Sequence, residues 1–121
     1  MSEAIDYLHE VFESLGPITA RRMFGGYGIY HDGVMFGLYA AGRLYLKTDA
    51  QNLPQFVAER CEPFTFSQRG KPVKLSYWSA PDVIMDDRDQ ARIWARSALD
   101  AALRAQLAKN KISKISTRKT T

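Results

Sequence analysis

Hydrophobic residues recur at steps of three and four positions near the start of the chain, which predicts an amphipathic helix. Ile5, Leu8, Phe12 and Leu15 share one stripe of such a helix. Ser2 is suited to cap its first turn, and Gly16-Pro17 is suited to end it.

From residue 18 to residue 47 the pattern changes to short runs rich in β-branched and aromatic residues, separated by glycines. The runs ITARRMF, GYGIYH, VMFGLYA and RLYLK predict strands. Asp32-Gly33 predicts a two-residue hairpin turn, because both positions of such a turn need positive φ angles. Ala41-Gly42 predicts a second turn and Gly25-Gly26 a bend or bulge. Short turns between consecutive strands make these strands antiparallel.

The second half of the chain predicts a short helix, another hairpin and a long helix. Residues 52–61 form the short helix, with Asn52 as its cap and Pro54 in its first turn. Apolar and polar residues alternate on both sides of a turn at residues 69–72, which predicts the hairpin. Asp86 or Asp87 is expected to cap the last helix. Its apolar band consists of Ala91, Trp94, Ala95, Ala98, Leu99, Ala102 and Leu103.

Alternation predicts two unlike faces for the sheet, because residues two apart lie on the same face. The face beneath the helices is expected to collect Phe36, Leu38, Leu44, Leu46, Phe64, Phe66, Val73 and Leu75. The opposite face is expected to carry Arg21, Met35, Tyr39, Arg43, Tyr45, Lys47, Lys74 and Trp78. Large aromatics mixed with cations are typical of protein interfaces and of stacking platforms for single-stranded nucleic acid. A solvated sheet face is the alternative. A bulge at the glycines would exchange the faces of Arg21 and Arg22.

The charge of the chain is concentrated at its C-terminal end. The net charge is +4, and residues 109–121 hold Lys109, Lys111, Lys114, Arg118 and Lys119 without an acid. The other residues carry 12 bases and 13 acids, a net charge of −1. We therefore divide the chain into a domain at residues 1–108 and a basic, flexible tail at residues 109–121. Such a tail is suited to non-specific contact with phosphates.

The sequence contains no motif that would identify an enzyme or a metal centre. The glycines at 25–28 are followed by a strand instead of the helix of a dinucleotide site, and Gly70-Lys71 lacks the other residues of a phosphate loop. The acids Asp82, Asp86, Asp87 and Asp89 are explained by helix capping, and the lone Cys61 by a structural thiol. We expect no catalytic residue, no cofactor and no bound metal.

The last helix carries an outer row of charged residues at four-residue steps, namely Arg88, Arg92, Arg96, Asp100 and Arg104. Arg96 with Asp100, and Asp100 with Arg104, have the spacing of exposed ion pairs. A solvated helix face is expected, and a partner-binding ridge is the alternative.

Four segments closely resemble the N-terminal domain of the TfoX/Sxy family of bacterial competence regulators. They are RRMFGGYGIY at 21–30, LYLKTD at 44–49, GKPVKLSYWSAP at 70–81 and WARSALDAA at 94–102. The resemblance implies a two-layer α+β sandwich similar to secretion chaperones, with helices on one face of a five-stranded antiparallel sheet in the order α-β-β-β-α-β-β-α. It also implies homodimers and action with a transcription factor, the cAMP receptor protein. Full-length regulators of this kind carry a C-terminal helical domain, in whose place this chain has the basic tail.

Three hypotheses for function follow. The first is a cytoplasmic, non-catalytic, dimeric regulatory module whose interaction surface consists of Arg21, Arg22, Tyr39, Arg43, Tyr45, Lys47, Lys71, Lys74 and Trp78. The cytoplasm is expected because the first ten residues contain three acids and no apolar signal segment. The second is direct nucleic-acid binding by the basic tail together with that sheet face. The third is a small enzyme that uses Tyr27, Arg22 and Lys71 around the glycine bend.

Overall fold

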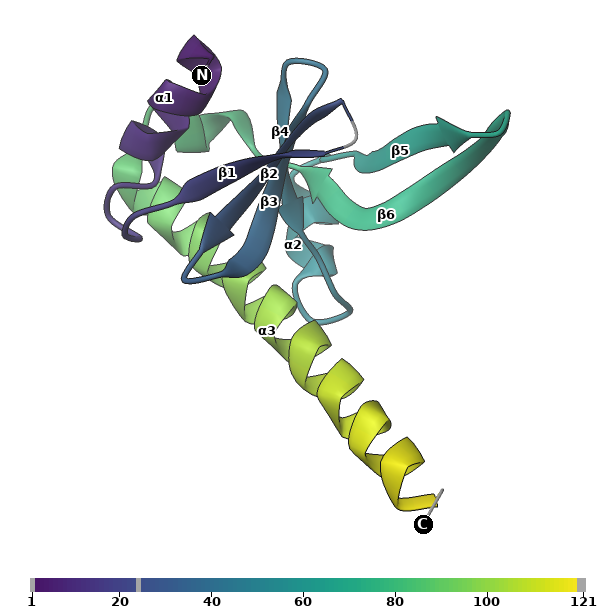
Figure 1. Cartoon of the computed structure of the whole chain (residues 1–121). Helices are drawn as coiled ribbons and strands as arrows, with labels where there is room; N and C mark the ends of the chain where they lie inside the picture. Colours follow the sequence, from purple (N-terminus) through teal and green to yellow (C-terminus); the bar gives the residue numbers. More distant parts are fainter. Residues whose placement is uncertain (1, 24, 120–121) are drawn as a thin grey trace.

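The computed structural model describes residues 2–23 and 25–119, and only the backbone at Lys74 and at residues 111–119. One antiparallel sheet packs on the helices (Figure 1). The elements are α1 (Glu3–Val11), β1 (Thr19–Met23), β2 (Gly26–His31), β3 (Val34–Ala40), β4 (Arg43–Lys47), α2 (Leu53–Ala58), β5 (Pro63–Gln68), β6 (Lys71–Ser79), the 3-10 helix η1 (Asp82–Met85) and α3 (Arg88–Lys119).

The sheet has six strands in the order β1-β2-β3-β4-β6-β5. The predicted α+β class is confirmed. The four runs and the hairpin of the sequence pattern account for the six strands, whereas the five strands implied by the family resemblance are too few. The glycine bend separates β1 from β2. These two strands pair from Thr19 with Tyr30 to Met23 with Gly26.

Two-residue turns join β2 to β3 and β3 to β4, as the sequence predicts. Asp32 and Gly33 have φ angles of 49° and 78°, and Ala41 and Gly42 have φ angles of 51° and 75°. Such left-handed pairs match the twist of a hairpin. The turn between β5 and β6 has the same form, with positive φ at both of its residues.

The main core lies between the helices and one face of the sheet. Phe12, directly after α1, meets Phe36 of β3 edge to face, with ring centroids 5.3 Å apart. Phe56 of α2 meets Trp94 of α3 in the same way at 5.0 Å. Edge-to-face pairs of this kind stabilise the packing beyond the apolar area that they bury. These contacts fix all three α-helices on the same side of the sheet.

The helix starts agree with the sequence at two of three places. The Ser2 hydroxyl accepts a hydrogen bond from the Ile5 amide, and the Asp87 carboxylate accepts hydrogen bonds from the amides of residues 89 and 90. Asn52 precedes α2, but its side chain makes no capping hydrogen bond there. Asn52 therefore stands at the predicted cap position without a capping hydrogen bond, because its amide group is engaged elsewhere.

Helix α3 continues to Lys119, into the segment that was expected to be a flexible tail, and it projects away from the sheet (Figure 1). No proline or glycine interrupts residues 88–119, so nothing in the local sequence stops the helix. The division of the chain at residue 108 stays a prediction.

Candidate interaction surface

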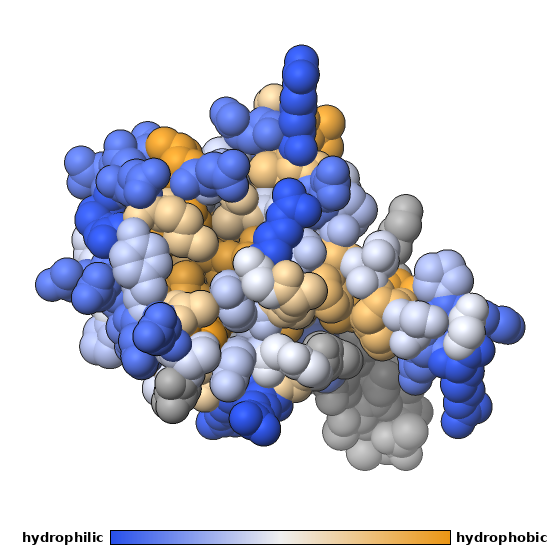
Figure 2. Space-filling view, turned by 90° about the horizontal axis from the view of Figure 1, so that it is seen from above, coloured by the Kyte–Doolittle hydropathy of each residue, from blue (hydrophilic) through white to orange (hydrophobic). Residues whose placement is uncertain are grey.

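A second apolar cluster lies on the face of the sheet opposite to the helices. We call this surface the open sheet face. At its centre Leu38, Ala40 and Phe64 are buried. Half-buried residues surround this centre, namely Met23, Met35, Tyr45, Phe66, Leu75 and Tyr77. Seen from above, apolar side chains are visible at the surface in the middle of the molecule, between hydrophilic ones at its edge (Figure 2).

Register explains why these side chains gather. Leu38 lies opposite Tyr45 in the β3–β4 pair, and Tyr45 lies opposite Ser79 in the β4–β6 pair. The Tyr45 ring meets Phe64 edge to face at 4.9 Å, and Phe64 stacks on Phe66 at 6.1 Å. The open sheet face therefore continues without a break from β3 to β5.

Cations lie over aromatic rings at two places on the open sheet face. The Arg21 guanidinium lies 5.0 Å from the centre of the Tyr30 ring, and the Lys47 ammonium lies 5.4 Å from the centre of the Tyr77 ring. Burial lowers the pKa of Lys47, and the negative charge of the nearby Asp49 partly offsets this decrease. Burial also raises the pKa of Tyr77 to about 12. The face thus combines cations, aromatics and aliphatic side chains in a partly desolvated setting.

The structure corrects the predicted membership of this face. Trp78 lies opposite Leu46, and Tyr39 lies opposite Leu44, so both aromatics belong to the core beneath the helices. Tyr45 and Trp78 therefore lie on opposite faces, and they do not form one stacking platform. Conversely, four residues predicted beneath the helices belong to the cluster of the open sheet face, namely Leu38, Phe64, Phe66 and Leu75.

The physical reason is that both faces of this sheet are apolar. Alternation within β6 separates Leu75 and Tyr77 from Trp78, but it cannot say which set faces the helices. In β3 the register shifts, since Ile29 pairs with Gly37 while the next residue of β2 pairs with Met35. This bulge places Phe36 in the core although Leu38, two residues on, lies on the open sheet face.

The other predicted surface residues are dispersed. Arg43 forms an ion pair with Glu62 at 3.5 Å. Lys71 is exposed at the tip of the β5–β6 hairpin, and Lys109 is exposed on α3. Lys74 pairs through its backbone with Thr65. The side chains of Lys74, Lys111, Lys114, Arg118 and Lys119 lie outside the described part of the chain.

The glycine bend forms a pocket of about 420 Å³ lined by Arg22, Met23, Gly25, Gly26 and Tyr27. Arg22 and Tyr27 thus lie together, as the enzyme hypothesis requires, whereas Lys71 lies at the hairpin tip. The three residues named for catalysis are therefore not gathered at this bend.

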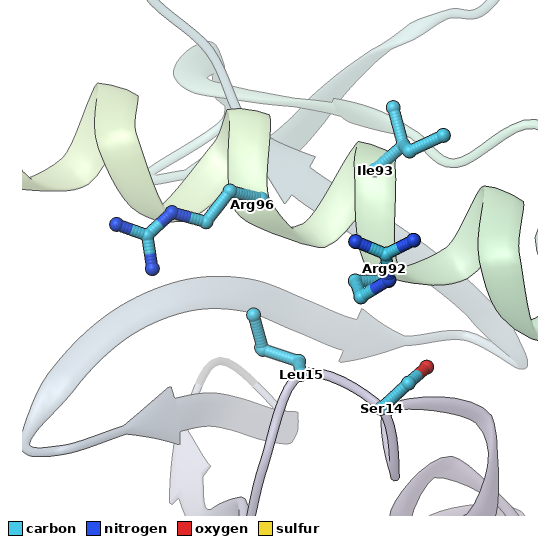
Figure 3. Close-up of a pocket in the computed structure, with 5 residues that line it drawn as sticks. All are labelled: Ser14, Leu15, Arg92, Ile93 and Arg96. Atoms are coloured by element: carbon cyan, nitrogen blue, oxygen red, sulfur yellow. The ribbon is translucent and has the colours of Figure 1, made fainter.

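A groove of about 350 Å³ lies between α3 and the loop that follows α1 (Figure 3). Arg92, Ile93 and Arg96 line it from α3, and Ser14 and Leu15 line it from the loop. Both arginines pair with acids of their own helix, Arg96 with Asp100 at 3.3 Å and Arg92 with Asp89 at 3.9 Å. The predicted Arg96–Asp100 pair is thus confirmed, and exposed pairs of this kind add little stability.

Arg104 does not pair with Asp100 as predicted, because it binds the loop after β4. Its Nε and one terminal nitrogen donate hydrogen bonds to Asp49 at 2.5 and 2.9 Å. Beside this pair the buried Asn52 amide nitrogen donates to the carbonyl oxygens of Lys47 and Ser97, at 3.1 and 3.3 Å. The Asn52 amide oxygen accepts from the Asp49 amide at 2.8 Å. This network ties β4 and α2 to α3, and sequence reasoning missed it.

No group of three His, Cys, Asp or Glu side chains within residues 2–23 and 25–119 has a geometry that could hold a metal ion. Within the same ranges, no helix combines the length and the hydropathy needed to cross a membrane.

Comparison with known proteins shows the family of this chain. The family model of the TfoX N-terminal domain matches residues 10–102. This chain belongs to the TfoX N-terminal domain family. The match includes all six strands, α2, η1 and the first half of α3.

Curated relatives of this family also match the chain. Protein Sxy of Escherichia coli is 27% identical over 101 residues, which cover 84% of this chain and 48% of Sxy. The DNA transformation protein TfoX of Haemophilus influenzae is 31% identical over 86 residues, which cover 69% of this chain and 40% of that protein. The chain therefore spans half or less of the length of these TfoX and Sxy relatives.

Proposed function

We propose that this chain is a non-catalytic regulatory protein in competence-related control of transcription, and that it binds a protein partner through the open sheet face. The TfoX and Sxy relatives point to a competence-related regulatory role. The proposal that a protein partner binds the open sheet face depends on the structure of that face.

The composition of the open sheet face is the observation that carries this proposal. Half-buried Met35, Tyr45, Leu75 and Tyr77 surround a buried apolar centre, and no described helix packs on this side. Contiguous apolar patches on a protein surface mark interaction sites. Tyrosine and methionine are also enriched at the centres of protein interfaces. The cations at Arg21 and Lys47 supply the polar rim that such interfaces have.

The partner that we propose is a transcription factor similar to the cAMP receptor protein. A second copy of the chain is the other partner implied by the family resemblance, and we retain homodimer formation in the cytoplasm as part of the proposal. Both partners present folded surfaces. A pre-formed sheet face can contact such a surface without a large change of backbone shape.

Calorimetric titration of the intact chain with the cAMP receptor protein of the same bacterium tests the proposal. Tyr45→Ala is the informative variant, because this ring lies in the middle of the open sheet face. Tyr7→Ala is the matched control, since Tyr7 lies on α1 and is 40% exposed. We expect binding by the natural chain and the control, and a loss of about tenfold or more in affinity for Tyr45→Ala.

Sedimentation equilibrium of the same three proteins tests the homodimer. We expect a dimer for the natural chain and the control. A monomeric chain that also fails to bind the transcription factor would overturn the proposed function. Equal binding by Tyr45→Ala and by Tyr7→Ala would show that the open sheet face is not the surface used.

A further inference from the structure

The β5–β6 hairpin extends beyond the rest of the sheet as a two-stranded ribbon. β5 and β6 pair from Pro63 with Trp78 to Gln68 with Lys71. β4 pairs only with the end of β6, at Tyr77, Trp78 and Ser79. The residues between these pairs and the turn have no third strand beside them, and the ribbon projects from the body (Figure 1).

The ribbon is basic and its tip is exposed. Arg69, Lys71 and Lys74 lie in residues 63–81, which contain no acid. All six residues from 67 to 72 are exposed. The described ion pairs include neither Arg69 nor Lys71. Glu62, at the base of the ribbon, is already paired with Arg43. The positive charge of the ribbon is thus held apart from the rest of residues 1–108, which hold 9 bases and 13 acids and so carry a net charge of −4.

A tight turn holds Arg69 and Lys71 at the end of a formed hairpin. Arg69 and Gly70 have φ angles of 54° and 77°, which close a tight two-residue turn. Phe64 stacks on Phe66 along β5 and so anchors the ribbon at its base. The tip is therefore the end of a formed hairpin, with a width set by two paired strands.

We propose that the β5–β6 hairpin is a basic arm that binds duplex DNA, with its tip in the major groove and Arg69 and Lys71 at the phosphates. The major groove, about 12 Å wide, admits a two-stranded β-ribbon. Arginine and lysine supply the phosphate contacts that position such an element. Gln68 and Arg69 are also residue types that bond to base edges. This activity is additional to the proposed protein contact, which uses the open sheet face.

The tip favours DNA over an acidic protein surface. Residues 67–72 are Ser, Gln, Arg, Gly, Lys and Pro, without an aromatic or aliphatic anchor. Protein interfaces depend on such anchors seated in desolvated pockets. Phosphate contacts need only accessible cations and polar groups. Helix α3, which also projects from the body, adds exposed Lys109 as a further cation.

Fluorescence anisotropy with a labelled duplex of about 20 base pairs tests the arm, at salt between about 50 and 200 mM. The variant is Arg69→Asn combined with Lys71→Gln. Asparagine tolerates the positive φ at position 69 better than most residues, so the turn is preserved. The matched control combines Arg92→Gln with Arg96→Gln, which removes the same charge from the surface of α3. Thermal unfolding of both variants verifies that they are folded.

We expect salt-dependent binding by the natural chain and by the control. The hairpin variant should lose about tenfold or more in affinity, and its slope of log K against log salt should fall by about 1.8 in magnitude, about 0.9 for each lost phosphate contact. Failure of the natural chain to bind at the lowest salt would overturn the proposal, as would equal losses in the two variants. Poly-glutamate of matched charge is added as a competitor of the labelled duplex. Displacement as effective as that by unlabelled duplex would indicate a general site for acidic surfaces and would also overturn the proposal. All these readouts are independent of the transcription factor titration.

Discussion

Arg104 of α3 holds Asp49, 55 positions earlier in the chain, through two hydrogen bonds to the same carboxylate. The pair joins the loop after β4 to the middle of the longest helix. The hydrogen bonds from Arg104 lower the pKa of Asp49 from 3.8 to about 2, helped by the backbone amides of Asn52 and Gln51.

Asp49→Asn is expected to destabilise the protein at neutral pH and to change its response to acid. The folded-state pKa lies below the unfolded value, so the charged carboxylate stabilises the fold above about pH 4, and this stabilisation is lost as the pH falls to about 2. Urea unfolding between these pH values measures the effect. The natural chain should lose more stability on acidification than Asp49→Asn. Parallel curves for the natural chain and Asp49→Asn would contradict the role of the pair.

Leu38→Ala tests whether the open sheet face holds a packed cluster. Leu38 is fully buried although no described helix covers it. Its truncation should therefore lower the free energy of unfolding by about 2 to 4 kcal/mol. Leu107→Ala is the control, because Leu107 is 67% exposed on α3. A loss of less than about 0.5 kcal/mol for Leu38→Ala, the usual range for surface positions, would mean that this face is solvated.

Gly26→Ala and Gly28→Ala should differ strongly in stability. A Cβ atom at Gly26 would lie 2.0 Å from the Tyr39 carbonyl oxygen, which belongs to the backbone of the neighbouring strand. At Gly28 the nearest atoms belong to the Met23 side chain, with its Cε at 2.7 Å. Backbone in a sheet cannot move aside, whereas a methionine end can rotate. We expect a loss of about 3 kcal/mol or more for Gly26→Ala and about 1 kcal/mol for Gly28→Ala in urea unfolding. Similar losses of stability in the two variants would contradict the close approach of Gly26 to the backbone of Tyr39.

Tyr77→Phe should remove part of the sensitivity of the fold to alkali. Burial raises the pKa of Tyr77 to about 12, above its ordinary value of 10.0. The neutral phenol therefore contributes stability below about pH 10, and this contribution is lost as the pH rises towards 12. Denaturant unfolding across that window should show a smaller fall for Tyr77→Phe than for the natural chain. Equal falls in stability for the two proteins across that window would contradict the prediction.

The order of the elements could be predicted because local chemistry encodes it. Asp32-Gly33 and Ala41-Gly42 form turns, and Asp87 begins α3, as their residue types require. The sequence predicted less well which side chains lie on which face of the sheet, because Leu46 and Trp78 become neighbours only when two separate hairpins align. The bulge at Phe36 has no local signal other than the adjacent Gly37.

The Asp49–Arg104 pair was also beyond the sequence alone. Regular spacing on α3 suggested Asp100 as the partner of Arg104, and only the tertiary fold brings Asp49 closer. The Asp49-x-x-Asn52 spacing, typical of side chains that bond to nearby backbone amides, was the available signal. The two residues do form such bonds.

Oxidative footprinting of the intact chain, alone and bound to the cAMP receptor protein, tests the interaction surface most directly. Methionine and tyrosine side chains report on their own exposure in this measurement. We predict that oxidation of Met35, Tyr45 and Tyr77 falls on binding while that of Tyr7 is unchanged. Protection of Tyr7, with Met35, Tyr45 and Tyr77 oxidised as in the free chain, would contradict binding through the open sheet face.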